Sequence, residues 1–234
     1  MTDEAAGGTG GTGTGGARGS GAGGTAGVPG GAEGAGGVPD KAGLRARLLA
    51  ARALLTTEEV RRAAGELSAA ALRLPELAGA RTVAAYVSVG REPGTRALID
   101  ALRARGVRVL LPVLLADNDL DWAVYEGSHG LARARLSLLE PSGPRLGPEA
   151  VTEADAVLLP GLAVDARGMR LGRGGGSYDR VLARLARVGA DPALVVLLYP
   201  HEVVARVPEE PHDHPVHAVV TPDGVRRFTA PGPR

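Results

Sequence analysis

The 234-residue chain has no cysteine, a single tryptophan and a single phenylalanine, and aromatic residues make up only 3% of it. Without cysteine it can form no disulfide bond, offer no thiolate nucleophile and bind no zinc through sulfur. It also has no apolar run long enough to cross a bilayer, and its first residues lack the basic start and apolar core of a signal peptide. These absences predict a soluble cytoplasmic protein with no membrane partner.

An excess of one charge is absent as well, because 27 basic residues nearly balance 26 acidic ones and the formal net charge is +1. Basic side chains gather without compensating acids in only one short segment, within residues 170–180. A nucleic-acid partner would need a broader basic surface, so none is expected.

Glycine, in contrast, is abundant, and 17 of the 36 glycines fall within residues 1–37. That segment is almost entirely Gly, Ala and Thr without apolar periodicity, so it is predicted to be a disordered tail. The remaining residues 38–230 are enough for one domain with a buried core. We expect a monomer or a weak homodimer.

Helical and extended patterns alternate along residues 38–230. One helix is predicted to begin at Asp40, and a second at the capping box formed by Thr56 and Glu59. The predicted strands are 82–89, 107–113, 120–125, 154–159, 193–199 and 216–220, with helices at 94–106 and 178–188 and a last short strand after a turn at 222–224. This alternation, with several strands apolar throughout, indicates an α/β fold: a single three-layer, Rossmann-like domain whose mostly parallel sheet has helices on both faces.

The most distinctive segment is residues 170–180, where four glycines stand among three arginines just ahead of a helical pattern. Each ordered glycine costs about 0.5–1 kcal/mol more than alanine, which indicates that a ligand approaches this backbone closely. Ser177 is predicted to cap the helix, and the free amides at a helix N-terminus favour an anion. Arg170, Arg173 and Arg180 would add charged donors, so a polyphosphate is the expected guest. A surface loop enriched in glycine and arginine by a GC-biased genome is the alternative.

Three familiar motifs do not fit this loop. A P-loop needs Lys followed by Ser or Thr after its last glycine, and a dinucleotide fingerprint needs a third glycine where Ser177 stands. A serine-hydrolase elbow needs a glycine at the position of Asp179. Generic phosphate binding is what remains.

Two carboxylates are candidates for a metal site. Asp179, at the start of the predicted helix, and Asp213, in residues 211–217, could supply the oxygen ligands that Mg²⁺ takes beside a nucleotide. Asp179 has the alternative role of interacting with the helix dipole. His212 and His214 would share one face of an extended segment, as in a transition-metal site, although the flanking prolines favour a rigid loop that presents Asp213 to a cleft.

Other candidates have two interpretations each. Glu92 follows a predicted strand, where such sheets bind ligands, or it is an ordinary solvated acid that pairs with Arg91. Lys41 and Arg45 are four residues apart on one helix face, where both could reach a phosphate or form a solvated basic surface. Trp122 either packs in the core or at an edge of the sheet, or it is a platform on which a ligand ring stacks.

Taken together, residues 157–165 and 168–180 resemble the 5-formyltetrahydrofolate cyclo-ligases, also called methenyltetrahydrofolate synthetases. They read Val-Leu-Leu-Pro-Gly-Leu-Ala-Val-Asp and Gly-x-Arg-Leu-Gly-Arg-Gly-Gly-Gly-Ser-Tyr-Asp-Arg. The resemblance extends from Lys41 to about Phe228. It implies an α/β architecture similar to that of sugar isomerases and CoA transferases, and the use of ATP and Mg²⁺ to close the folate substrate 5-formyltetrahydrofolate into 5,10-methenyltetrahydrofolate.

The resemblance also implies roles for residues. Those implied to bind ATP are Lys41, Arg45, Arg170, Leu171, Gly172, Arg173, Gly174, Gly175, Gly176, Ser177 and Tyr178. Of these, Lys41, Arg173 and Tyr178 are implied to be catalytic. Those implied to contact the folate are Val87, Glu92, Arg173, Gly174, Gly175, Gly176 and Ser177, and the implied Mg²⁺ ligands are Asp179 and Asp213.

The chain departs from the family pattern in its aromatic residues. The family usually has two tyrosines where this chain has Ser177 and Tyr178, and residues 114–120 lack the aromatic side chains that often line the pterin pocket. Trp122 and Tyr125 are the candidates to compensate. Two other functions stay open: a phosphosugar isomerase or transferase of related architecture, which needs no nucleotide, and a non-catalytic sensor of a phosphate ligand.

Overall fold

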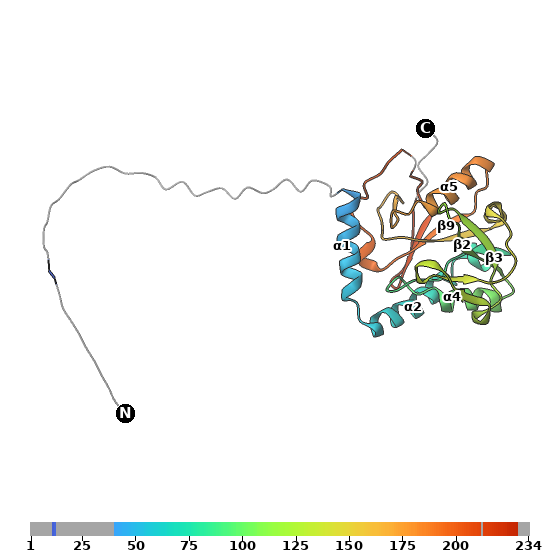
Figure 1. Cartoon of the computed structure of the whole chain (residues 1–234), viewed down its shortest axis with the longest axis horizontal. Helices are drawn as coiled ribbons and strands as arrows, with labels where there is room; N and C mark the ends of the chain where they lie inside the picture. The colour runs from blue at the N-terminus through green and yellow to red at the C-terminus, as the bar shows by residue number, and fades with distance from the viewer. Residues whose placement is uncertain (1–10, 13–39, 212, 229–234) are drawn as a thin grey trace, which may run out of the picture. The chain divides into compact units, whose positions relative to one another are not determined.

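The computed structural model describes residues 11–12, 40–211 and 213–228 (Figure 1). The chain divides into two units, Met1–Ala35 and Gly36–Arg234, and only residues 11 and 12 of the first are described. The predicted disorder of residues 1–37 therefore lies outside the described residues, and the domain limits 38–230 stay a prediction. Within the described ranges, none of the helices is long and apolar enough to cross a membrane.

Three helices open the second unit. α1 (Lys41–Leu54) begins at Asp40, whose carboxylate accepts a hydrogen bond from the Gly43 amide at 2.7 Å. α2 (Thr57–Ala71) begins at Thr56, and reciprocal hydrogen bonds between Thr56 and Glu59 confirm the predicted capping box. α3 (Pro75–Ala78) is one further turn that the sequence pattern does not predict.

A seven-stranded sheet lies at the centre of this unit, in the order β11-β10-β9-β6-β1-β2-β3. Its strands are β1 (Thr82–Ala84), β2 (Arg108–Leu114), β3 (Leu120–Val124), β6 (Ala156–Pro160), β9 (Ala193–Leu197), β10 (Ala218–Thr221) and β11 (Gly224–Arg227). Neighbouring strands are parallel except at the two edges, where β3 is antiparallel to β2 and β11 to β10. The mostly parallel sheet predicted from the apolar runs is thereby confirmed.

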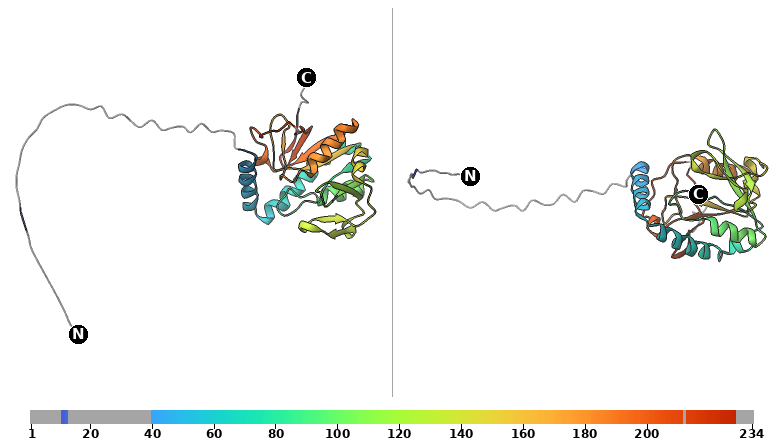
Figure 2. Two further views of the ribbon diagram at one scale, coloured as in Figure 1. Left: turned by 45° about the horizontal axis from the view of Figure 1, so that its top comes forward. Right: turned by 60° about the horizontal axis from the view of Figure 1, so that its bottom comes forward.

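Helices cover both faces of the sheet, as predicted, because successive strand residues point to opposite sides (Figure 2). Val83 packs in the same cluster as α2, α3 and α4 (Arg96–Ala104). Its neighbour Ala84 packs with α5 (Ser177–Val188) and the 3₁₀ helix η3 (Pro148–Glu153). A third cluster places Leu44 and Leu48 of α1 against a small hairpin formed by β7 (Ala163–Val164) and β8 (Arg170–Leu171).

The order of the strands reverses between β1 and β6. From β1 the chain runs through α4 to the adjacent parallel strand β2, which confirms the predicted β-α-β unit, whereas β6 is followed in the sheet by β9 on its other side. Ligands of such sheets bind beyond the carboxyl ends of the strands at this switch point. The segment with Glu92 follows β1, and the glycine loop follows β6 by way of the β7–β8 hairpin.

β1 is shorter than the predicted strand at 82–89. From Tyr86 onward the main chain leaves the sheet, because the Tyr86 carbonyl accepts from the Thr95 hydroxyl at 2.6 Å and the Ser88 amide donates to the same hydroxyl at 3.0 Å. Thr95 is fully buried. Its hydroxyl therefore turns this segment toward the crevice.

A second small hairpin, which the sequence pattern does not predict, lies beside β2. It consists of β4 (Leu131–Arg133) and β5 (Leu139–Pro141), and Glu140 accepts a hydrogen bond from the Leu114 amide at 3.0 Å. The remaining 3₁₀ helices are η1 (Ser128–Gly130), η2 (Arg135–Ser137) and η4 (Pro200–Glu202).

Candidate active site

The glycine loop joins β8 to α5 through two residues in left-handed backbone conformations. Gly174 has φ +96° and Gly176 has φ +75°, values that side chains other than glycine rarely allow. Gly176 is the N-cap of α5, so the prediction that Ser177 caps this helix is wrong. Gly176 already turns the chain into α5, so Ser177 is the first residue of the helix. Ser177 does not cap the helix but lines a cavity.

α1 brings two predicted phosphate ligands to this loop. The Arg45 side chain donates to the Gly172 carbonyl at 2.9 Å, and a Cβ at Gly174 would lie 3.5 Å from the Arg45 guanidinium carbon. One turn earlier, Lys41 donates to Asp213 at 2.7 Å and to Glu210 at 2.8 Å. Burial alone would lower the pKa of Lys41, but these two carboxylates outweigh it and raise the pKa. The ammonium is therefore held in its charged form.

Arg170 lies beneath the loop and is buried, at 7% exposure. It donates to Asp179 at 2.7 Å and to the Pro160 carbonyl at 3.1 Å. A Cβ at Gly172 would come within 2.9 Å of this guanidinium, so the close approach explains one glycine of the loop. Leu171 is also buried, beneath α1, so only its main chain is available to a ligand.

The predicted metal ligands each contact a cation of the protein. Asp179 pairs with Arg170 and Asp213 pairs with Lys41. Burial lowers the pKa of Arg170, and the charges of Asp179 and Asp213 both oppose that shift, so both carboxylates act electrostatically on this guanidinium. In the described part of the chain there is no cluster of three or more His, Asp or Glu side chains, and His212 lies outside it.

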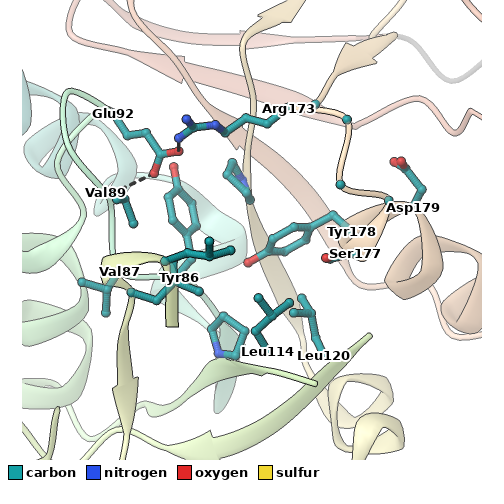
Figure 3. A pocket seen from close by; sticks show the side chains of 18 of the residues that line it. Tyr86, Val87, Val89, Glu92, Leu114, Leu120, Arg173, Ser177, Tyr178 and Asp179 are labelled. Atoms are coloured by element: carbon teal, nitrogen blue, oxygen red, sulfur yellow. Dashed lines mark hydrogen bonds and ion pairs between the residues drawn. The ribbon is translucent and has the colours of Figure 1, made fainter. Parts of the chain in front are cut away.

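A cavity of about 470 Å³ opens between the end of β1 and the glycine loop (Figure 3). All residues implied to contact the folate line it, namely Val87, Glu92, Arg173, Gly174, Gly175, Gly176 and Ser177. Its other lining residues include Tyr86, Val89, Pro112, Leu114, Leu120, Leu136, Leu138, Leu139, Glu140, Pro160, Arg170, Gly172, Tyr178 and Asp179. The cavity therefore lies between the glycine loop and a largely apolar wall.

Glu92 is at the polar end of this cavity. It is 9% exposed, and its carboxylate accepts from the Val89 amide at 2.9 Å and from Arg173 at 3.1 Å. The alternative that Glu92 is a solvated acid paired with Arg91 is therefore wrong. A buried carboxylate in a cavity can accept further hydrogen bonds from a ligand.

A buried ion pair that the sequence reasoning missed supports the Glu92 segment. Arg52 donates to Glu202 at 2.6 Å and 2.9 Å, and to the Gly161 carbonyl at 2.6 Å. Glu202 in turn accepts from the Tyr199 amide, and the Tyr199 hydroxyl donates to the Arg91 carbonyl at 3.2 Å. These bonds link α1, the end of β6 and the residue next to Glu92. The one feature of the sequence that could have indicated this ion pair is that Arg52 lies on the helix face that otherwise carries Leu44 and Leu48.

The apolar wall also differs from the prediction. Trp122 is fully buried in the core, and the Tyr125 hydroxyl donates to Asp100 at 2.6 Å, so neither lines the cavity or compensates for missing aromatic residues. Tyr86 and Tyr178 supply the aromatic rings instead, and the β4–β5 hairpin supplies leucines such as Leu136. The hairpin escaped prediction because its strands are only three residues long.

The profile of the 5-formyltetrahydrofolate cyclo-ligase family matches residues 38–222. The chain belongs to this family. It is 45% identical over 149 residues to the 5-formyltetrahydrofolate cyclo-ligase of Mycolicibacterium smegmatis, which covers 61% of this chain and 74% of that protein. It is 32% identical over 176 residues to the 5-formyltetrahydrofolate cyclo-ligase of Escherichia coli, and the alignment covers 74% of this chain and 96% of that protein.

A solved structure agrees with this assignment. The NMR structure of 5,10-methenyltetrahydrofolate synthetase from Aquifex aeolicus superposes with a TM-score of 0.70 at 29% identity, and covers 83% of this chain and 95% of that one. The resemblance seen in residues 157–165 and 168–180 is thereby confirmed. This cyclo-ligase family member is an enzyme of the ligase class.

Proposed function

We propose that this cyclo-ligase uses ATP to close 5-formyltetrahydrofolate into 5,10-methenyltetrahydrofolate, with release of ADP and phosphate. The observation that carries the proposal is that the glycine loop and Glu92 line the same cavity. A phosphate-binding backbone and a carboxylate that can hold a heterocycle thus face the same space. Transfer of a phosphoryl group between two substrates requires that they meet in such a space.

The nucleotide is proposed to bind where α1, the loop and α5 converge. Main-chain amides of Gly172, Gly174 and Gly175 and the first turn of α5 favour the phosphates, as at other helix N-termini. Arg45 reaches the loop from α1, and Lys41 lies on the same helix and contacts Asp213, which supports their role as charged ligands of the phosphates. The buried side chain of Arg170 donates to Asp179 and so fixes the position of this carboxylate at the end of the loop.

Asp179 and Asp213 are the proposed ligands of Mg²⁺. Mg²⁺ beside a nucleotide commonly takes one or two protein carboxylates and completes its shell with phosphate oxygens and water, so two aspartates whose charges both act on Arg170 are a suitable ligand type for this ion. When bound, Mg²⁺ would neutralise charge on the phosphates. Lys41 and Arg170 hold these carboxylates in place.

The proposed reaction has two steps. The formyl oxygen attacks the γ-phosphorus of ATP, the bond to ADP breaks, and the formyl carbon becomes an iminium-type centre carrying a phosphate ester. Nitrogen 10 of the folate then attacks that carbon and loses its proton, which is released with the inorganic phosphate that leaves carrying the former formyl oxygen. ATP is needed because an amide-like oxygen leaves poorly unless it is phosphorylated.

In this scheme the protein groups align the two substrates and neutralise charge on the transferred phosphoryl group, and no protein nucleophile takes part. Arg173 is 55% exposed at its side chain, on a glycine loop, which supports a role in neutralising the transferred phosphoryl group. Burial raises the pKa of Tyr178, so its hydroxyl stays protonated and can donate a hydrogen bond but not act as a base. Lys41 supplies a second positive charge, which its ion pair with Asp213 holds in place.

The proposal is tested with purified protein, 5-formyltetrahydrofolate, ATP and Mg²⁺. The near-ultraviolet absorbance of the methenyl product should appear only when all four components are present, and its increase should stop when the metal is chelated. ATP should also raise the melting temperature by mass action, which distinguishes this function from that of a phosphosugar isomerase. Stabilisation by ATP and folate without product would instead identify a non-catalytic sensor.

A further inference from the structure

Two tyrosines that line the cavity have hydroxyls that lack a hydrogen-bond partner among the described residues. They belong to Tyr86 and Tyr178, and both oxygen atoms are shielded from solvent. Buried hydroxyls are nearly always hydrogen-bonded in proteins. Two unbonded hydroxyls on one cavity therefore indicate a ligand that bonds to them.

Tyr86 is the more informative of the two because of its neighbour. It is 5% exposed and follows β1, and Figure 3 shows its hydroxyl pointing to the same end of the cavity as the Glu92 carboxylate. The charge of Glu92 acts on Tyr86, which agrees with this proximity. The hydroxyl of Tyr178 points instead into the middle of the cavity (Figure 3).

The protonation of Tyr86 decides what its hydroxyl can do. Burial raises its pKa well above the usual value, and the negative charge of Glu92 raises it further. The phenol is therefore neutral at physiological pH and has a proton to donate. A carboxylate such as that of Glu92 only accepts.

We propose that Tyr86 is a substrate-binding, specificity-determining residue whose hydroxyl donates to a ring carbonyl while Glu92 accepts from the adjacent ring N–H. This inference rests on the proposed function and deepens it. An acceptor beside a donor complements a lactam-type edge, in which an N–H and a C=O are neighbours. The 2-amino-4-oxopyrimidine ring of a folate has such an edge, whereas a 2,4-diamino ring has an amino group in place of the carbonyl.

Tyr86→Phe tests the proposal because it removes the hydroxyl and leaves the ring. Calorimetry of the full chain with 5-formyltetrahydrofolate, without ATP, should show a dissociation constant about 3- to 10-fold higher than in the unmodified protein, the usual effect of one lost neutral hydrogen bond. The affinity for ATP should not change. Equal folate affinity in both proteins, or an equal loss of ATP affinity, would overturn the proposal.

Tyr125→Phe is the matched control. It deletes the same group from a hydroxyl that bonds to Asp100 and does not line the cavity. Folate affinity should be unchanged in this variant, and a loss equal to that of Tyr86→Phe would mean that the effect is structural.

A ligand pair tests the ring-edge recognition itself. The unmodified protein should prefer 5-formyltetrahydrofolate over its 4-amino counterpart, which lacks both the ring carbonyl and the adjacent ring N–H. Tyr86→Phe should lose the part of that preference that depends on the carbonyl, and an undiminished preference would contradict the proposed donor. These are binding measurements, so they remain informative if the protein binds folate without turnover. In that case the proposed reaction fails and the role of Tyr86 is still decided.

Discussion

Arg173 donates a hydrogen bond to Glu92 at 3.1 Å, although the two residues are 81 positions apart in the sequence. The contact joins an exposed arginine of the glycine loop to a buried carboxylate that the Val89 amide already holds. Arg173, which is proposed to act on phosphate, is thus paired with Glu92, which is proposed to bind folate.

Glu92→Gln tests the folate side of this pair. Hydrogen bonds to charged groups contribute about 1.5–3 kcal/mol, so the KM for 5-formyltetrahydrofolate should rise about 10-fold or more. The KM for ATP should change less. Steady-state kinetics give both values, and Glu153→Gln, at an exposed ion pair with Arg108, is the control. An unchanged folate KM would show that Glu92 does not contact the substrate.

Arg173→Ala tests the nucleotide side. Among the described residues Arg173 makes one monodentate contact, to Glu92, and its own side chain is 55% exposed, so water can take its place and the free energy of unfolding should fall by about 1 kcal/mol or less. Turnover should be lost because charge on the transferred phosphoryl group is no longer neutralised. Urea denaturation and product absorbance separate the two effects. Arg187→Ala, at a surface pair on α5, should affect neither, and loss of stability in step with activity would contradict the assigned role.

Glu202→Gln should destabilise the whole domain. Glu202 is fully buried and is the carboxylate partner of Arg52, which is 3% exposed. Removing one member of a buried pair costs about 3–5 kcal/mol, because the other charge remains without compensation. Denaturant titration measures the change, and a loss below about 1 kcal/mol, the range of exposed pairs, would mean that water reaches Arg52.

Acid should destabilise the domain partly through Asp165. Burial would raise the pKa of this carboxyl, but hydrogen bonds from the Val207 and Met169 amides and from Arg167 outweigh it, so the pKa is lowered. A lowered pKa stabilises the folded state above the unfolded value of about 4, and the contribution is lost as pH falls through the folded value. Unfolding free energies measured from pH 6 downward should therefore decrease below about pH 4. Asp165→Asn should show a smaller decrease, and an equal decrease would exclude Asp165 as a cause.

Locally determined features could be predicted from the sequence. The capping box of Thr56 and Glu59 depends on residues three positions apart, so α2 begins where the pattern predicts. The parallel strands could be predicted because both of their faces are buried, which makes them apolar throughout. Gly176 replaced Ser177 as the cap of α5 because its left-handed backbone, and not side-chain chemistry, turns the chain into the helix.

Features that depend on distant partners could not be predicted. The burial of Glu92 results from Arg173 and from the turn that Thr95 imposes after β1. Trp122 is in the core because β3 joins the sheet as an antiparallel edge strand, and short-range spacing does not specify which face then packs on α5. The partners of Arg52 lie 109 and 150 positions away, which leaves no local pattern.

The most direct test of the proposed reaction is its stoichiometry. Purified protein with Mg²⁺, limiting 5-formyltetrahydrofolate and excess ATP should release ADP and form the methenyl chromophore in equal amounts, and ADP release should cease when the folate is exhausted. ADP released without the chromophore, or the chromophore formed without ADP, would contradict the coupling of the two substrates in one cavity.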